Sequence, residues 1–96
     1  MPEYSRVVMF DAASADAIDA LVKEIDAAEG PPPGVDASRI IVLANQDRSR
    51  AAVVVRFPSE EAMKKGGEVL GAMDPPEGLT RSSVEELEIL LERTAS

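Results

Sequence analysis

The most apolar part of the chain lies between Arg39 and Phe57, where two runs of apolar residues flank the polar stretch 46–49. Both runs are short and rich in β-branched residues, which indicates two strands joined as a hairpin. If Asn45 pairs opposite Arg50, the side chains alternate between two faces. One face then carries Ile41, Leu43, Ala52 and Val54, and the other carries Ile40, Val42, Ala44, Ala51, Val53 and Val55. Because both faces are apolar, we expect each of them to be covered.

The residues before the hairpin predict a strand followed by a helix. Residues 4–10, YSRVVMF, form a short β-branched run that ends at the turn-forming Asp11. Ser14 is a suitable N-cap for a helix, and Gly30 with the three following prolines ends it. The apolar side chains of this helix, at helical spacing, are Ile18, Leu21, Val22 and Ile25.

A second helix is predicted after the hairpin, over residues 59–73, SEEAMKKGGEVLGAM. Its apolar side carries Met63, Val69, Leu70 and Met73. Adjacent glycines at 66 and 67 weaken a helix by about 1 kcal/mol each relative to alanine, so they need a reason. Close packing of the helix on the sheet is favoured over contact with a ligand.

The last apolar segment, residues 82–93, has two interpretations. Val84, Leu87 and Leu91 form a helical stripe, whereas Leu87, Ile89 and Leu91 alternate with glutamates as in a strand. The order strand, helix, hairpin, helix needs a final strand to complete a split βαβ sheet, so we predict a strand. The expected fold is α+β and ferredoxin-like, βαββαβ, with a four-stranded antiparallel sheet, two helices on one face and a single domain over residues 1–96.

This arrangement, with PSEEA at 58–62 and RSSVEELEIL at 81–90, resembles the dimeric α/β-barrel superfamily near its antibiotic-biosynthesis-monooxygenase-like group. The resemblance covers essentially the whole chain. It implies a homodimer in which two sheets face each other, so that the partner covers the sheet face without helices. The expected dimer interface consists of Ile41, Leu43, Ala52 and Val54.

The charge and composition exclude several classes of function. Ten basic residues against 18 acidic ones give a net charge of -8, which disfavours nucleic acid and anionic membranes as partners. The chain has no Cys, His or Trp, so thiolate and imidazole chemistry, the usual zinc sites and haem ligation by His or Cys are excluded, and we expect no cofactor or metal. The apolar runs are too short to cross a bilayer and the N-terminus lacks a signal pattern, so a cytoplasmic protein is expected.

Other families with this topology require residues that are missing here. RNA-recognition motifs stack bases on aromatic residues of the third strand, where this chain has Ala52 and Val54. Metal-transport domains need a pair of cysteines, and acylphosphatases need an arginine in the first loop. The acidic sets Asp16, Asp19 and Asp26, and Glu85, Glu86 and Glu88, are interpreted as a solvated helix face and as protection of a strand edge.

The resemblance implies little about activity. Cofactor-independent oxygenases of the group use polar residues in a cleft, of which Tyr4, Asn45 and generic arginines remain, and the haem-degrading members need His and Trp. No catalytic residue is assigned. We expect a non-catalytic or small-molecule-binding module, with a monooxygenase-like enzyme acting on an aromatic or polyketide-like substrate as one alternative and an ACT-like effector sensor as another.

A small apolar ligand, if bound, is expected where the second helix meets the sheet. Glycine leaves room there and methionine adapts to irregular gaps. Arg39, Asn45 and Arg56 are interpreted either as polar groups at the rim of the interface or as anion contacts. The candidate ligand-binding residues are Tyr4, Asn45, Arg56, Phe57, Met63, Gly66 and Gly67.

Overall fold

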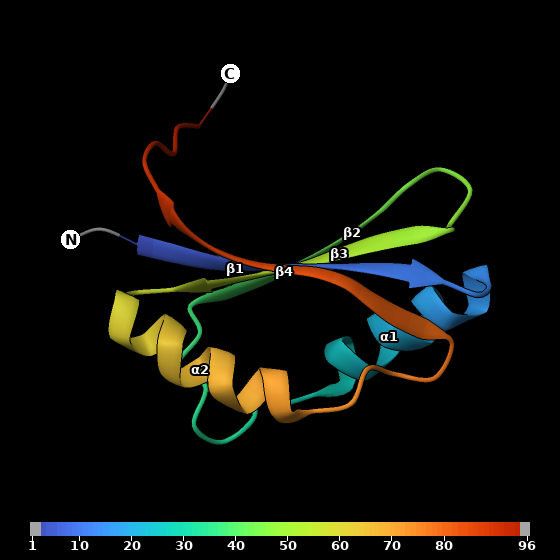
Figure 1. Cartoon of the computed structure of the whole chain (residues 1–96), viewed down its shortest axis with the longest axis horizontal. Coiled ribbons are helices and arrows are strands. Elements are labelled where there is room, and N and C mark those ends of the chain that lie inside the picture. The colour runs from blue at the N-terminus through green and yellow to red at the C-terminus, as the bar shows by residue number, and fades with distance from the viewer. Residues whose placement is uncertain (1–2, 95–96) are drawn as a thin grey trace.

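The computed structural model describes residues 3–94 and contains four strands and two helices within that range. In chain order these are β1 (Glu3–Ala12), α1 (Ala15–Ala27), β2 (Arg39–Ala44), β3 (Arg50–Phe57), α2 (Glu60–Ala72) and β4 (Leu79–Ile89). The sheet has the order β2-β3-β1-β4, with every neighbouring pair antiparallel. Both helices lie on the same side of the sheet (Figure 1). The predicted ferredoxin-like α+β fold is therefore confirmed.

The hairpin has the predicted register. Asn45 donates its backbone N–H to the carbonyl of Arg50, and Ile41 pairs with Val54. A network around the Asn45 side chain holds the turn, because its Oδ1 accepts from the backbone N–H groups of Ser49 and Arg50, each at 2.9 Å. Arg48 occupies the left-handed region in this turn, with φ of 60°. The polar stretch thus forms a tight turn that fixes which residues share a face.

The last apolar segment is a strand, as the topology predicted. β4 pairs with β1 along its whole length, with a bulge opposite Met9 and Phe10. The strand begins at Leu79, earlier than the sequence indicated, and ends at Ile89, so Leu91 lies outside it. Pairing with β1 overrides the helix preference of Glu and Leu, because helix propensity contributes little free energy compared with a ladder of backbone hydrogen bonds over the length of the strand.

The core lies between the sheet and the helices and divides into two clusters. α1 packs through Ala17, Ile18 and Leu21 on one cluster, and α2 packs through Met63 on Phe57 in the other. The predicted helix stripes are partly wrong at their margins, since Val22 and Met73 are 44% and 50% exposed. The buried hydrophobic residues are Val8, Phe10, Ala17, Ile18, Leu21, Val35, Ala51, Val55, Phe57, Met63 and Leu79.

The two helices begin at serines but are capped differently. The Ser59 hydroxyl accepts a hydrogen bond from the backbone N–H of Ala62, which is the usual N-cap contact. Ser14 stands at the N-cap of α1 with extended backbone angles, yet its side chain makes no cap hydrogen bond.

The turn before β4 contains Gly78, whose φ of +85° favours glycine. A Cβ atom at this position would also lie only 2.8 Å from the side chain of Ala17.

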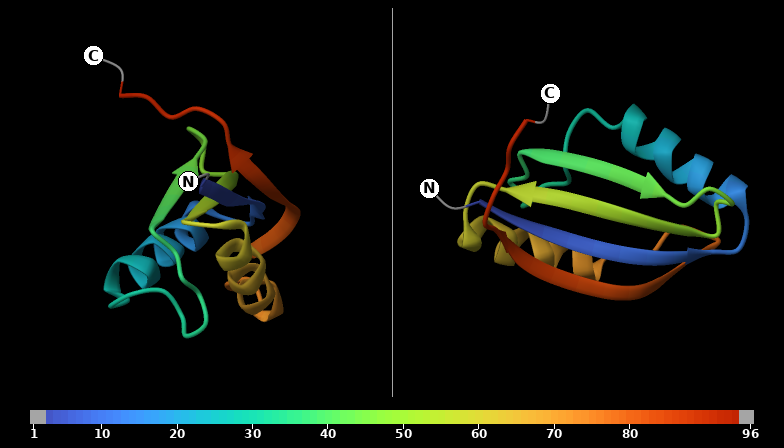
Figure 2. Two further views of the ribbon diagram at one scale, coloured as in Figure 1. Left: turned by 90° about the vertical axis from the view of Figure 1, so that its left-hand side faces the viewer. Right: turned by 90° about the horizontal axis from the view of Figure 1, so that it is seen from above.

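One face of the sheet carries no helix. Figure 2 shows this face from above, with the segment after β4 crossing it at the end where β1 begins. Within the described residues, neither helix is long and apolar enough to span a membrane.

Candidate functional site

The side of the sheet without helices is called the open face. It consists of the side chains that point to the same side of the sheet as those of Val7 and Val54, which pair with each other. Three of its apolar side chains are accessible and lie on the two outer strands: Ile41 and Leu43 on β2 and Leu87 on β4 are 41%, 53% and 48% exposed. The predicted interface residues Ile41, Leu43, Ala52 and Val54 lie together here, because Ile41 pairs with Val54 and Leu43 with Ala52. Their contact with a partner remains a prediction.

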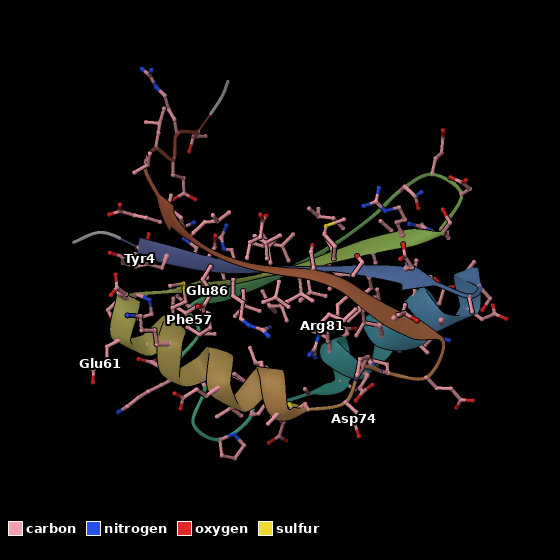
Figure 3. The ribbon with its side chains drawn as sticks, in the orientation of Figure 1. Tyr4, Phe57, Glu61, Asp74, Arg81 and Glu86 are labelled. Atoms are coloured by element: carbon pink, nitrogen blue, oxygen red, sulfur yellow. The ribbon has the colours of Figure 1, made fainter. Side chains whose placement is uncertain are left out.

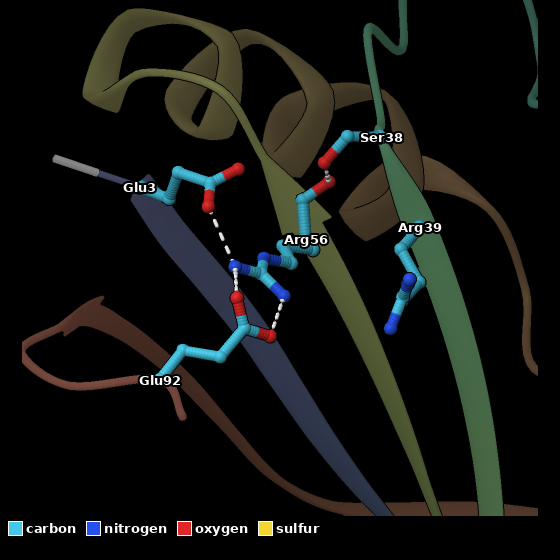
Figure 4. A pocket seen from close by; sticks show the side chains of 5 residues that line it. All are labelled: Glu3, Ser38, Arg39, Arg56 and Glu92. Atoms are coloured by element: carbon cyan, nitrogen blue, oxygen red, sulfur yellow. Dashed lines mark hydrogen bonds and ion pairs between the residues drawn. The ribbon is translucent and has the colours of Figure 1, made fainter. Parts of the chain in front are cut away.

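One end of the open face is occupied by a charged cluster around Arg56 (Figure 4). The Arg56 guanidinium donates to both carboxylate oxygens of Glu92, and its Nη2 donates to Glu3 Oε2 at 2.6 Å. These two carboxylates hold the pKa of Arg56 above its ordinary value, and the guanidinium in turn lowers the pKa of Glu92. The contacts between Arg56 and Glu92 hold the segment after β4 against the end of β3.

Two hollows on the surface lie on the open face. One, of about 260 Å³, is lined by Glu3, Ser38, Arg39, Arg56 and Glu92. The other, of about 170 Å³, lies at the opposite end and is lined by Met9, Leu43, Ala44, Asn45, Arg50 and Ala52. The first is dominated by an arginine that already has two carboxylate partners, so it offers little free charge to a ligand.

The expected space beside the glycines of α2 is filled by side chains. A Cβ atom placed on Gly66 would lie 2.5 Å from Cε1 of Phe57, whose side chain is fully buried. Gly66 therefore lets α2 approach the Phe57 ring, in agreement with the packing interpretation of the sequence. Gly67 faces a different group, since its Cβ would lie 2.8 Å from Glu86 Oε2 and 3.7 Å from the Arg6 side chain.

The seven candidate ligand-binding residues do not converge on one place. Met63 and Gly66 of α2 contact Phe57 of β3, and Tyr4 packs against this cluster. Asn45 lies at the far end of β3, roughly 20 Å or more from Tyr4 at about 3.3 Å per residue. Arg56 points to the open face, and Gly67 lies beside Arg6 and Glu86. Their shared role in binding stays a prediction.

Tyr4 is poorly suited to act as a base or nucleophile. Partial desolvation, followed by the charges of Glu88 and Glu60, raises the pKa of its phenol above the ordinary value of 10.0. The hydroxyl therefore stays protonated at neutral pH, which leaves the monooxygenase-like alternative without an anionic tyrosine.

Arg6 is the main feature that the sequence analysis missed. It is only 6% exposed and is the one buried charged or polar residue of the described chain. The sequence pattern could have predicted this burial, because Arg6, Val8 and Phe10 are every second residue along β1 and therefore share the face that packs on the helices. Burial, followed by the nearby charge of Arg81, lowers the pKa of the Arg6 guanidinium.

Among residues 3–94 there is no group of three or more acidic, His or Cys side chains arranged to hold a metal ion. The chain matches no protein-family model, and comparison with curated proteins and with solved structures gave no significant match. The function is therefore argued from the geometry alone.

Proposed function

We propose that this protein is a non-catalytic, small-molecule-binding module that works as a homodimer, with the open faces of two sheets packed against each other. The observation that carries the proposal is the apolar surface of the open face, where Ile41, Leu43 and Leu87 are about half exposed. Apolar surface of this extent, rimmed by charged residues, marks an interaction surface in soluble proteins.

The size of the face supports a second copy as the occupant. Four strands about 4.8 Å apart and about six residues long cover roughly 400 Å² as a flat surface, and protruding side chains enlarge it. A standard interface buries about 800 Å² per partner. Leu90 and Leu91, 87% and 80% exposed, belong to the segment after β4, which crosses this side of the sheet (Figure 2) and supplies further apolar area. This segment therefore enlarges the apolar area of the face toward the size of a standard interface.

The distribution of charge also suits self-association. The middle of the face is apolar on β2, β3 and β1, with Glu85 beside it on β4, and each end carries both signs, with Arg39 and Glu92 at one end and Asp11 and Arg50 at the other. In a two-fold dimer the same patch meets itself, so a patch of one sign would repel its copy. A mixed rim avoids this repulsion.

Light scattering on Val54→Asp tests the proposal. Val54 lies at the centre of the open face, and a carboxylate there would be buried without a partner in the dimer, so we expect a monomer. Val22→Asp on α1 is the matched control, because Val22 is 44% exposed and lies on the other side of the sheet. This control should leave the mass of the assembly unchanged.

An unchanged dimer in Val54→Asp would contradict the face-to-face arrangement. It would direct attention to β2, an outer strand with the apolar sequence RIIVLA whose edge has no neighbour in the described chain. A monomeric wild-type protein would contradict the dimer altogether.

The resemblance to the antibiotic-biosynthesis-monooxygenase-like group supports a cofactor-independent oxygenase as the alternative, and an ACT-like sensor is the second alternative. The scattering of Tyr4, Asn45 and Arg56 over three places favours the non-catalytic proposal. Thermal unfolding in the presence of aromatic polyketide-like compounds and of amino acids separates these functions. Stabilisation by either class supports the corresponding alternative.

A further inference from the structure

Two arginines lie on the helix side of the sheet where the C-terminal half of α2 meets β1 and β4. A Cβ atom on Gly67 would lie 3.7 Å from Arg6 Nε, and one on Gly71 would lie 3.8 Å from Arg6 Nη2. The Arg6 side chain thus extends along α2 from Gly67 to Gly71. Arg81 lies on the same side of the sheet, as Figure 3 shows, and is close enough to lower the pKa of Arg6.

The Arg6 side chain is buried overall but has no partner within the described chain, and its guanidinium nitrogens keep contact with solvent, since the buried nitrogens without a partner are Arg56 Nε and Arg81 Nε. None of the side-chain hydrogen bonds or ion pairs formed among residues 3–94 includes Arg6. Glu86 attracts it but forms no ion pair with it. Buried charges in proteins are normally paired and hydrogen-bonded, because desolvation is costly.

Arg81 has a partial explanation within the fold. Its Nη2 donates to the carbonyl of Met73 at 3.2 Å, at the C-terminal end of α2, where cations are favoured by the helix dipole. Its Nε, however, is buried and has no acceptor within the described chain. The charged groups that act on Arg6 are those of Arg81 and Glu86, so this set of two guanidiniums and one carboxylate carries one excess positive charge.

We propose that this place, called the Arg6–Arg81 site, binds a small monocarboxylate between α2 and β4. A guanidinium matches the two oxygens of a carboxylate in geometry, and one negative charge balances the excess. Gly71 and Glu86 are exposed, so the site borders on solvent, and Val84, 43% exposed on the same face of β4, offers contact to an apolar body. The proposal specifies the ligand class of the proposed binding module and is independent of dimer formation.

The net charge of the protein makes the test specific. At -8 the chain repels anions in general, so stabilisation by an anion beyond that of chloride indicates a local site. We expect the thermal unfolding temperature to rise with butyrate concentration, compared with sodium chloride at equal ionic strength and with the neutral amide butyramide. A ligand that binds only the folded state must produce such a rise.

Substitution of the arginines locates the effect. Arg6→Met removes the unpaired buried charge, so it should unfold at a higher temperature than the wild type without butyrate and lose the butyrate shift. Arg81→Gln should weaken the apparent affinity for butyrate about tenfold, as expected for a lost charge-assisted hydrogen bond. This second variant still tests the site if Arg6→Met fails to fold. Arg93→Met, in the exposed segment after β4, changes the net charge equally and should keep the full shift.

The opposite results overturn the proposal. Equal unfolding temperatures in butyrate and chloride for the wild type would show that the two arginines bind no carboxylate and serve folding alone. A butyrate shift that persists in both Arg6→Met and Arg81→Gln would place the anion elsewhere. Light scattering on the same samples reports the dimer separately, so failure of the Arg6–Arg81 site and failure of the dimer are distinguishable.

Discussion

At the scale of single residues, the contact between Arg56 and Glu92 makes the attachment of the C-terminal segment depend on pH. The guanidinium lowers the pKa of Glu92 below its ordinary value of 4.5 in the folded protein. A depressed pKa contributes stability that is present above the ordinary value and is lost as the pH falls through the lowered one. We therefore expect the segment to be held against Arg56 at neutral pH and released in acid.

Amide hydrogen exchange of residues 90–93 measures this attachment. Wild-type exchange should accelerate as the pH falls, after correction for the intrinsic pH dependence, whereas Glu92→Gln should exchange fast throughout. Glu77→Gln, in an exposed loop before β4, is the control and should behave as the wild type. Equal protection in wild type and Glu92→Gln at neutral pH would show that the ion pair does not hold the segment.

The sequence was sufficient to predict the surroundings of some residues but not those of others. The alternation along β1 was sufficient to place Arg6 on the buried face, because a period of two is a property of the strand itself. The partners of Arg56 were not predictable, since Glu3 and Glu92 are 53 and 36 positions away from it and meet it only through the order of strands.

At the scale of elements, substituting alanine for two glycines of α2 should change the stability of the protein in opposite directions. In Gly66→Ala the new methyl group would lie 2.5 Å from the buried Phe57 ring, and we expect a net loss of about 1–3 kcal/mol despite the better helix propensity. In Gly71→Ala the nearest atom would lie 3.8 Å away, which is an ordinary contact, so we expect a gain of up to about 1 kcal/mol. Urea unfolding measures both changes, and a more stable Gly66→Ala protein would show that α2 is not held against Phe57.

The elements themselves were largely predictable, for identifiable reasons. The hairpin was predicted with its register because a short polar turn and two apolar runs permit few alternatives, and the network around Asn45 fixes one of them. β4 was predicted from topology against its local helix propensity, whereas its true start at Leu79 depends on a turn at Gly78 that the pattern did not reveal. The space expected beside Gly66 is filled by the Phe57 ring, whose position the sequence pattern does not reveal, and the ligand-binding role of these residues stays a prediction.

At the scale of the whole molecule, the net charge of -8 opposes the association of two identical chains. The apolar centre of the open face must outweigh this repulsion, which acts over the Debye length of about 30 Å at 0.01 M salt and about 8 Å at 0.15 M. We therefore expect added sodium chloride to tighten the dimer several-fold, measured as the Kd from dilution in light scattering or sedimentation. Glu29→Lys, in the loop after α1 and away from the open face, lowers the net negative charge by two per chain and should reduce this salt dependence.

The direction of the salt effect discriminates between two ways of forming the interface. If the apolar centre drives association, salt screens only the unfavourable repulsion between the chains, and the dimer tightens. If ion pairs across the rim, such as Arg39 with a carboxylate of the partner, supply the attraction, the same salt weakens the dimer. Because the accessible apolar residues of the face are Ile41, Leu43 and Leu87, we expect the first behaviour, and a dimer that dissociates as salt is added would contradict it.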